Sequence, residues 1–342
     1  MSWYCFLSTE RNKSTESENS NIRALEGYIM SFGYHCDLKP TLLETVQSQY
    51  ESNGTKCIQC YIGGKDFNGS DLRDTKVFME ATGFRLYTHS CLRMNLGSGY
   101  QKNIDTLRVE LKPVLATGGS TVVHIGSRNM GGVKGAGTLD NVISSVKALG
   151  VKERVDDERS SSGDGSCGSD GVVGRVTALK RQRWPLLLEN AAGEGAKMGS
   201  DLEDLAYLFE KLEGVGVGFV LDTAHAFGAG LFDFESKESI LEMFELIDEN
   251  VGVGKLQLIH LNDSKIPFGG CNDRHENLGK GYIWEDSLES CGFLLRECRR
   301  RGVDVLLETP SEGVMEDYEK GCGMLREEEE EDEAEADDEK DG

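Results

Sequence analysis

The sequence predicts a closed α/β barrel of eight βα repeats, the TIM-barrel fold, on three observations. From Met30 onward, short apolar runs alternate with stretches of helical period, which is typical of βα units and a parallel sheet. Eight such runs fit into about 300 residues, as this barrel requires. Side chains of metal-ligand type end most of the runs, and a barrel brings the carboxyl ends of its strands to one mouth, whereas an open sheet would spread them along an edge.

Each predicted strand is a short apolar run bounded by turn residues. The eight strands are expected at Ser31–Cys36, Lys56–Ile62, Gly83–His89, Ser120–Gly126, Trp184–Glu189, Gly216–Leu221, Leu256–Leu261 and Val303–Glu308. Helical periodicity predicts the helices between them. These are expected at Thr41–Tyr50, Leu72–Thr82, Tyr100–Ala116, Leu139–Leu149, Asp201–Leu212, Ser236–Asn250 and Glu285–Arg301, with a last helix from Glu312 to about Arg326.

The barrel domain is expected over residues 29–326, with three flexible segments in or beside it. Residues 1–28 are rich in Ser, Asn, Glu and Thr, which predicts a loosely ordered arm. Residues 151–176 are rich in Ser, Gly and Asp, and we interpret them as an inert flexible insertion rather than a regulatory or partner-binding one. Residues 327–342 hold twelve acids and one lysine, which predicts a disordered tail carrying −11 of the net charge of −23.

Composition indicates a soluble protein inside the cell. No run of 18 apolar residues appears and the chain turns polar soon after Leu7, so we expect neither a membrane partner nor a secretory signal, and we place a monomer in the cytoplasm or nucleus. Ten cysteines are too dilute for a disulfide scaffold. The pair Cys57 and Cys60 has redox-motif spacing but lies in a strand-like run, so we interpret both as reduced cysteines.

Five of the six histidines end an apolar run or lie just beyond one: His89, His124, His225, His260 and His275. Histidine is the commonest metal ligand, and most of the five have a carboxylate nearby. The pattern therefore predicts one polynuclear metal site at the mouth of the barrel.

Two local motifs support that site. Asp222 and His225 lie three residues apart just beyond a strand, so their side chains can diverge to neighbouring metals. Asp273 and His275 are separated by one residue, so an extended backbone points both to the same side, where they can share one ion. Alone, an Asp-Arg-His run is more often a solvated turn, but its combination with the strand-end ligands favours a metal site.

These stretches make the chain resemble endonuclease IV, the zinc-dependent apurinic/apyrimidinic endonucleases of AP endonuclease family 2, which cut DNA at abasic sites. The matches follow the family's order over about residues 30–310. They are LLLENAAGEG at 186–195, LDTAHAFGAG at 221–230, HLNDSK at 260–265, DRHENLGKG at 273–281 and LETP at 307–310, with weaker ones at 89–97 and 123–127.

The resemblance implies a TIM barrel with three zinc ions in its mouth. Carried over by position, the ligands would be His89, His124 and Glu189 for one ion; Glu189 as a bridge, Asp222, His260 and Glu308 for the second; and His225, Asp273 and His275 for the third. Three divalent ions would also offset much of the acidic charge, so net charge does not exclude DNA.

The activity implied is hydrolysis of the phosphodiester bond 5′ to an abasic site in double-stranded DNA, in base excision repair. The products would be a 3′-hydroxyl and a 5′-deoxyribose phosphate. Metals of this kind lower the pKa of bound water to about 7 and draw charge from phosphate, so no side-chain nucleophile is needed. Glu189 and Glu308 are the carboxylates expected to take part in catalysis.

Contacts to DNA are expected from loops near the mouth. Lys265, Arg274 and Lys280 suit phosphate binding, and the functional interpretation is favoured most for Arg274, which lies between two expected ligands. The family inserts side chains into the base stack from early loops. Leu92 and Arg93 stand where it often has an aromatic ring, and a leucine can still wedge between bases.

Two further positions lie outside the family's ligand pattern. Ile125 replaces the family's usual proline. His35 matches a family histidine that is not a ligand, so we interpret His35 as a packed residue.

A sugar isomerase or epimerase on a related barrel would use a quartet of ligands, Glu189, Asp222, His260 and Glu308, and leave the other five without a role. A catalytically weakened DNA-binding barrel would not be expected to keep all nine.

Overall fold

The structure is a computed structural model that describes residues 30–129, 137–152, 154–155, 182–285 and 288–326. The arm expected over residues 1–28, the tail over 327–342 and most of the insertion expected over 151–176 lie outside the described residues. Among the helices that the structure describes, none is both long and apolar enough to cross a membrane.

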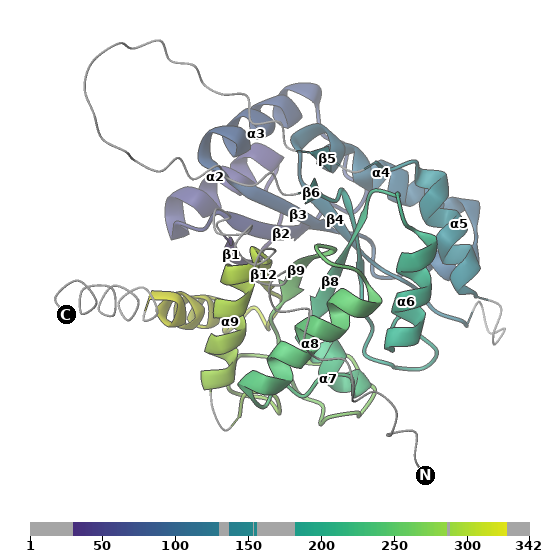
Figure 1. Cartoon of the computed structure of the whole chain (residues 1–342). Helices are drawn as coiled ribbons and strands as arrows, with labels where there is room; N and C mark the ends of the chain where they lie inside the picture. Colours follow the sequence, from purple (N-terminus) through teal and green to yellow (C-terminus); the bar gives the residue numbers. More distant parts are fainter. Residues whose placement is uncertain (1–29, 130–136, 153, 156–181, 286–287, 327–342) are drawn as a thin grey trace, which may run out of the picture.

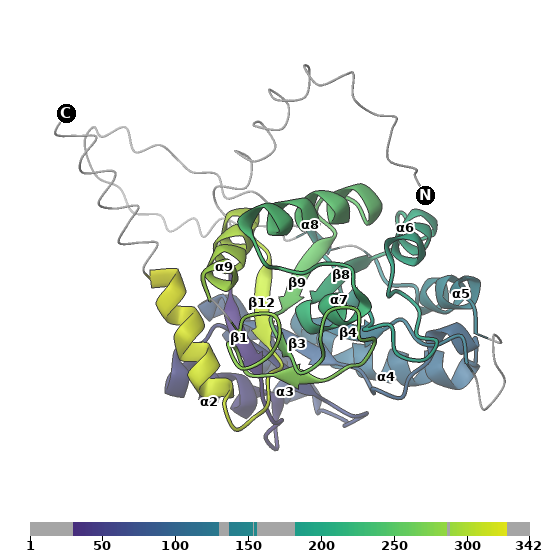
Figure 2. The same ribbon diagram turned by 90° about the horizontal axis from the view of Figure 1, so that it is seen from below.

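Eight parallel strands close into a barrel with helices around it, which confirms the predicted TIM-barrel fold (Figure 1, Figure 2). Neighbouring strands follow the order β1-β12-β9-β8-β7-β4-β3-β2. The strands are β1 Phe32–His35, β2 Cys57–Tyr61, β3 Arg85–His89, β4 Ser120–His124, β7 Leu186–Glu189, β8 Val217–Asp222, β9 Leu256–His260 and β12 Asp304–Leu307. Each lies within or next to one of the eight expected apolar runs.

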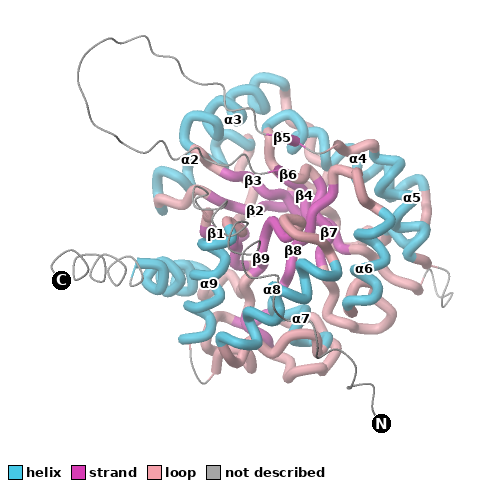
Figure 3. The backbone as a smooth tube through the Cα atoms, in the orientation of Figure 1, coloured by secondary structure: helices cyan, strands magenta, loops and turns pink. Residues whose placement is uncertain are grey.

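The helices form a layer outside the strands, as Figure 3 shows by colour. They are α2 Leu42–Asn53, α3 Gly69–Thr82, α4 Gln101–Thr117, α5 Leu139–Leu149, α6 Leu202–Lys211, α8 Lys237–Asn250 and α9 Glu289–Arg301, and a further helix covers residues 314–326. Local sequence sets their ends. Thr41 and Glu44 form a capping box at the start of α2, and Gly54 ends that helix at φ 66°, a left-handed conformation that glycine adopts without strain.

Four small features were not expected from the sequence. Helix α7 (Thr223–Ala229) follows β8 directly, and a 3₁₀ turn covers Leu96–Ser98. Two pairs of short strands are antiparallel: β5 (Arg154–Val155) pairs with β6 (Gln182–Arg183), and β10 (Asp263–Ser264) pairs with β11 (His275–Glu276). The first pair holds the two ends of the segment between α5 and β7 side by side.

An apolar layer fills the interior of the barrel below its mouth. One residue from each of seven strands contributes to it, and these residues pack in one cluster although they come from different sides of the barrel. With Trp184, they are Cys57, Tyr87, Val122, Leu187, Val220, Leu258 and Leu306. The alternate residues, such as Leu188 and Phe219, point outward and pack against the helices. The barrel is therefore a packed core beneath its site.

Candidate metal centre

The strands place seven polar side chains directly above the interior layer. Side chains alternate along a strand, so a residue two positions after an interior residue faces the same interior, one step nearer the carboxyl end. The residues two positions after the seven strand residues of the apolar layer are Gln59, His89, His124, Glu189, Asp222, His260 and Glu308. Six of the seven are ligands expected from the sequence, and Gln59 is not.

The first group joins β3, β4 and β7. Oε2 of Glu189 lies 3.1 Å from Nε2 of His89 and 3.0 Å from Nε2 of His124. His89 is buried, and its other ring nitrogen lies 2.9 Å from the Ser90 carbonyl oxygen, which directs Nε2 toward the group. Possible ligand atoms of the three residues lie within 4.8 Å of one another.

The second group joins β7, β8, β9 and the end of β12, and it shares Glu189 with the first. Nδ1 of His260 lies 3.1 Å from Oε1 of Glu189, 3.2 Å from Oε2 of Glu308 and 3.8 Å from Oδ2 of Asp222. Glu189 thus offers one oxygen to each group, which is the geometry that a bridging carboxylate needs.

The third group lies beside α7 and β11. Oδ1 of Asp273 is 3.2 Å from Nε2 of His225 and 3.3 Å from Nε2 of His275. Asp222 also approaches this group, since its Oδ2 is 3.6 Å from Nε2 of His275. Asp222 therefore lies between the second and third groups, and possible ligand atoms of Asp222, His225 and His275 lie within 4.8 Å of one another. The resemblance to endonuclease IV placed Asp222 with the second ion alone.

The unexpected helix α7 explains the spacing of Asp222 and His225. Asp222 is at once the last residue of β8 and the N-cap of α7, and its Oδ1 accepts a hydrogen bond of 2.8 Å from the backbone N–H of His225. No loop separates the two side chains. The start of the helix thus turns the His225 side chain toward Asp273 and His275. Nδ1 of His225 lies 3.1 Å from the Asn190 carbonyl oxygen.

Charges of opposite sign dominate the electrostatics of the three groups. Burial alone would raise the pKa of Glu189, but His124 and His260 outweigh it and hold that pKa well below its usual range. Burial alone would lower the pKa of His225 and of His275. Instead, Asp222 and Asp273 raise these values to about 10 and about 9.

The side chains fit metal ions. His225 and His275 each have a buried Nε2 atom that makes no hydrogen bond among the described residues. Buried polar atoms rarely lack a partner, and an imidazole nitrogen beside carboxylates is a natural ligand of zinc and related ions. The three groups are consistent with a multi-metal site.

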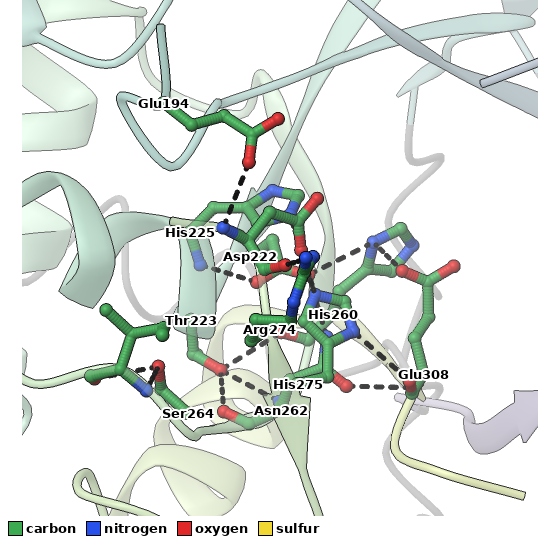
Figure 4. A network of polar contacts seen from close by, with 12 residues as sticks. Glu194, Asp222, Thr223, His225, His260, Asn262, Ser264, Arg274, His275 and Glu308 are labelled. Carbon is green, nitrogen blue, oxygen red and sulfur yellow. Dashed lines mark hydrogen bonds and ion pairs between the residues drawn. The ribbon is translucent and has the colours of Figure 1, made fainter. Parts of the chain in front are cut away.

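A network of uncharged side chains supports the ligands, and the sequence did not predict it (Figure 4). Asn262 donates to Oδ2 of Asp222 at 2.7 Å and accepts at 2.9 Å from the backbone N–H of Glu308. Thr223 donates to the Asn262 carbonyl oxygen at 2.6 Å. Their place in the sequence, one residue after Asp222 and two residues after His260, is the signal that could have revealed them.

The residues expected to contact DNA are exposed. Leu92 is 54% exposed and Arg93 follows it in the loop after β3. Arg274 is exposed and donates to the Asp273 carbonyl oxygen at 2.8 Å. Lys265 and Lys280 each lie 3.6 Å from a carboxylate, of Glu276 and Glu316 respectively.

Two remaining sequence positions lie at or beside the centre. His35 is half-buried, with Nδ1 3.6 Å from Oε1 of Glu308, so it contacts the second group. Ile125 is buried next to His124, where its side chain packs in the main hydrophobic core.

Comparison with known proteins agrees with this geometry. Residues 49–328 match the model of AP endonuclease family 2, described as a xylose isomerase-like TIM barrel. A relative from Carboxydothermus hydrogenoformans, named probable endonuclease 4, is 30% identical over 313 residues, which cover 87% of this chain and 97% of the relative. The chain belongs to the endonuclease IV family.

Solved structures show the same barrel in proteins of this family and in sugar epimerases. Endonuclease IV from Thermus thermophilus superposes with a TM-score of 0.66 at 22% identity over 87% of this chain and 99% of that one. A D-tagatose 3-epimerase-like protein gives 0.56 at 15% identity over 90% and 100%. At these identities the likeness shows the fold alone, so membership of the endonuclease IV family rests on the sequence matches.

Proposed function

We propose that this member of the endonuclease IV family is a zinc-dependent DNA repair endonuclease. It would hydrolyse the phosphodiester bond 5′ to an abasic site in double-stranded DNA and leave a 3′-hydroxyl and a 5′-deoxyribose phosphate. The observation that carries the proposal is the third group of ligands, His225, Asp273 and His275, beside the two groups that share Glu189. As a base excision repair enzyme it would work as a monomer in the cytoplasm or nucleus.

Nine side chains would hold the ions, in the assignment expected from the sequence. They are His89, His124, Glu189, Asp222, His225, His260, Asp273, His275 and Glu308. Zinc bound there would supply Lewis acidity, activating water and neutralising charge on the phosphate. Glu189 would contribute an oxygen to each of the first two ions, and Glu308 would help His260 to hold the second.

Exposed side chains around the mouth would hold the DNA. Arg274 projects from the segment that also carries Asp273 and His275, so a phosphate bound to it would lie beside the third group. Lys265 and Lys280 would add weaker phosphate contacts because each already has a carboxylate nearby. Leu92 and Arg93 would enter the base stack beside the extruded abasic nucleotide.

A sugar isomerase or epimerase is the second candidate. The second ligand group, with Glu189, Asp222, His260 and Glu308, is a complete site for one divalent ion, and sugar epimerases share the barrel fold. This function gives no role to the histidines of the first and third groups. A barrel that binds DNA without cutting it is the third candidate, and the presence of all nine ligand-type residues weighs against it.

One assay separates the three candidates. The purified chain is incubated with duplex DNA that carries a tetrahydrofuran abasic analogue, with and without a strong chelator, and its metal content is measured by elemental analysis. We expect a single cut 5′ to the analogue, abolished by the chelator, and zinc in the protein. Absence of cutting together with fewer than two zinc ions per chain would rule out the endonuclease.

A further inference from the structure

Gln59 lies at the centre of the mouth but comes from a strand that carries no candidate ligand. It is the middle residue of β2, its side chain is fully buried, and it stands two positions after Cys57 of the interior layer. An amide has both donors and an acceptor, and at full burial they need partners within the protein. The partners of Gln59 are members of the metal centre.

Three contacts fix the amide. Nε2 of Gln59 donates to Oε1 of Glu308 and lies 3.3 Å from Nδ1 of His35. Oε1 of Gln59 lies 3.1 Å from Nε2 of His260. The contacts connect β2 to the ends of β1, β9 and β12, and β9 is three places away from β2 in the barrel order. Gln59 therefore contacts its neighbouring strand β1 and also reaches across the mouth to His260 on β9.

Chemistry decides which amide atom faces which partner. An ionised carboxylate only accepts hydrogen bonds, so the amide nitrogen must face Glu308. The amide oxygen, which also only accepts, then faces Nε2 of His260, and that nitrogen must carry the hydrogen. In the neutral imidazole that a metal ion requires, the lone pair of His260 is then on Nδ1, the atom that lies 3.1 Å from Glu189 and 3.2 Å from Glu308.

We propose that Gln59 is a positioning residue of the metal centre, which selects the ligand atoms for the second ion. It holds the hydrogen of His260 on Nε2 and so presents Nδ1, and it occupies Oε1 of Glu308 and so presents Oε2. This inference rests on the proposed metal centre. It also gives a role to His35, whose Nδ1 faces the second hydrogen of the same amide.

The test compares zinc affinity in three variants with that of the wild type. Gln59→Leu removes the donor and the acceptor at nearly constant shape. Partners that orient metal ligands typically contribute about 10–100-fold to metal affinity, so we expect one of the three zinc ions to bind about 10–100-fold more weakly in competition with a chromophoric chelator. The other two should bind as in the wild type.

Gln257→Leu is the matched control. Gln257 is also a buried glutamine in a barrel strand, but it lies at the opposite end of the barrel from the centre. Its Oε1 accepts from the backbone N–H of Trp184 at 2.9 Å, and its Nε2 donates to Oγ of Ser120 at 3.1 Å. The same substitution there should lower the melting temperature of the metal-free protein without weakening any zinc ion.

Gln59→Glu provides a second test if the leucine variant does not fold. It keeps an oxygen for His260 but sets a carboxylate against Glu308, so it should also weaken one ion. Wild-type zinc affinity in either Gln59 variant, or equal weakening in Gln257→Leu, would overturn the proposal, as would a wild-type chain that binds no zinc. Because zinc binding is measured without DNA, a chain that binds zinc but does not cut contradicts only the proposed function.

Discussion

Oε1 of Glu189 lies 3.1 Å from Nδ1 of His260. The other oxygen of the same carboxylate faces the imidazoles of the first group, at 3.0 and 3.1 Å. One fully buried side chain thus joins two groups of ligands.

Glu189→Gln should abolish incision while leaving the fold intact. The amide is isosteric but uncharged, and charge stabilisation by a metal site is worth several kcal/mol, where each 1.36 kcal/mol corresponds to about tenfold in rate. We expect the cutting rate on a tetrahydrofuran duplex to fall by at least about a thousandfold, with an unchanged circular dichroism spectrum. Full activity in this variant would show that the metal assignment is wrong.

The metal-free protein should become less stable as the pH rises. Burial opposes protonation of His225 and His275, but nearby aspartates raise their pKa values from 6.5 to about 10 and about 9. Because the folded values exceed the ordinary one, the stabilising charge is fully present below pH 6.5 and is lost as pH rises through about 9 and 10. Calorimetry of chelator-treated protein should show a falling melting temperature across this window.

Zinc binding should release protons near neutral pH. Metal ions need unprotonated imidazoles, so zinc must displace the protons held on His225 and His275, whereas Asp273, whose pKa lies below its usual range, is already ionised. Titration calorimetry in two buffers of different ionisation enthalpy should report net proton release at about pH 7. Binding heats that are the same in both buffers would contradict this assignment of charge.

Arg274→Ala should weaken DNA binding in a salt-dependent way. Loss of one phosphate contact lowers the slope of log affinity against log salt by about 1. Lys265→Ala and Lys280→Ala should change the slope less, since each lysine lies 3.6 Å from a carboxylate. Fluorescence anisotropy gives the slopes, and zinc content shows whether the centre is intact. An unchanged slope in Arg274→Ala would remove this residue from the interface.

Deleting residues 327–342 should raise affinity for undamaged duplex at low salt. These residues carry twelve acids and one lysine, and their charge repels phosphate over about 10 Å at 0.1 M ionic strength. The gain should vanish at high salt, where the charge is screened. A chain of equal length with the acids replaced by Gln and Asn separates charge from bulk. No rise in affinity in either chain would exclude repulsion by the tail.

The barrel could be predicted from the sequence because every barrel strand is an apolar run, buried over most of its length. Six of the nine ligands follow those runs at a fixed offset: Leu187 lies in the interior layer and Glu189 in the centre, as do Leu258 and His260. The full set of nine came from the resemblance to endonuclease IV. Side chains alternate along a strand, so residues two positions apart point to the same side of the sheet. The expected flexible arm, insertion and tail stay predictions.

The missed features depend on contacts between distant segments. Gln59 lies among Cys57, Ile58 and Cys60, and nothing local shows that its partners are His260 and Glu308, which follow 201 and 249 residues later. Helix α7 has only seven residues, and a single N-cap at Asp222 begins it. Strands β10 and β11 have two residues each, too few to show an alternating apolar pattern, and they pair across the loop that separates them.

The strand order makes the mouth of the barrel asymmetric. The candidate ligands at the ends of barrel strands come from six consecutive neighbours, β12 through β3, and leave β1 and β2 as the remaining arc. That arc presents uncharged Gln59 and the ring of Tyr61, which is 43% exposed and packs at a tilt against the His35 ring, with the ring centres 4.5 Å apart. Under the proposed function, a DNA strand would therefore meet charged ligands on one side of the mouth and an uncharged aromatic wall on the other, so its two directions across the mouth would not be equivalent.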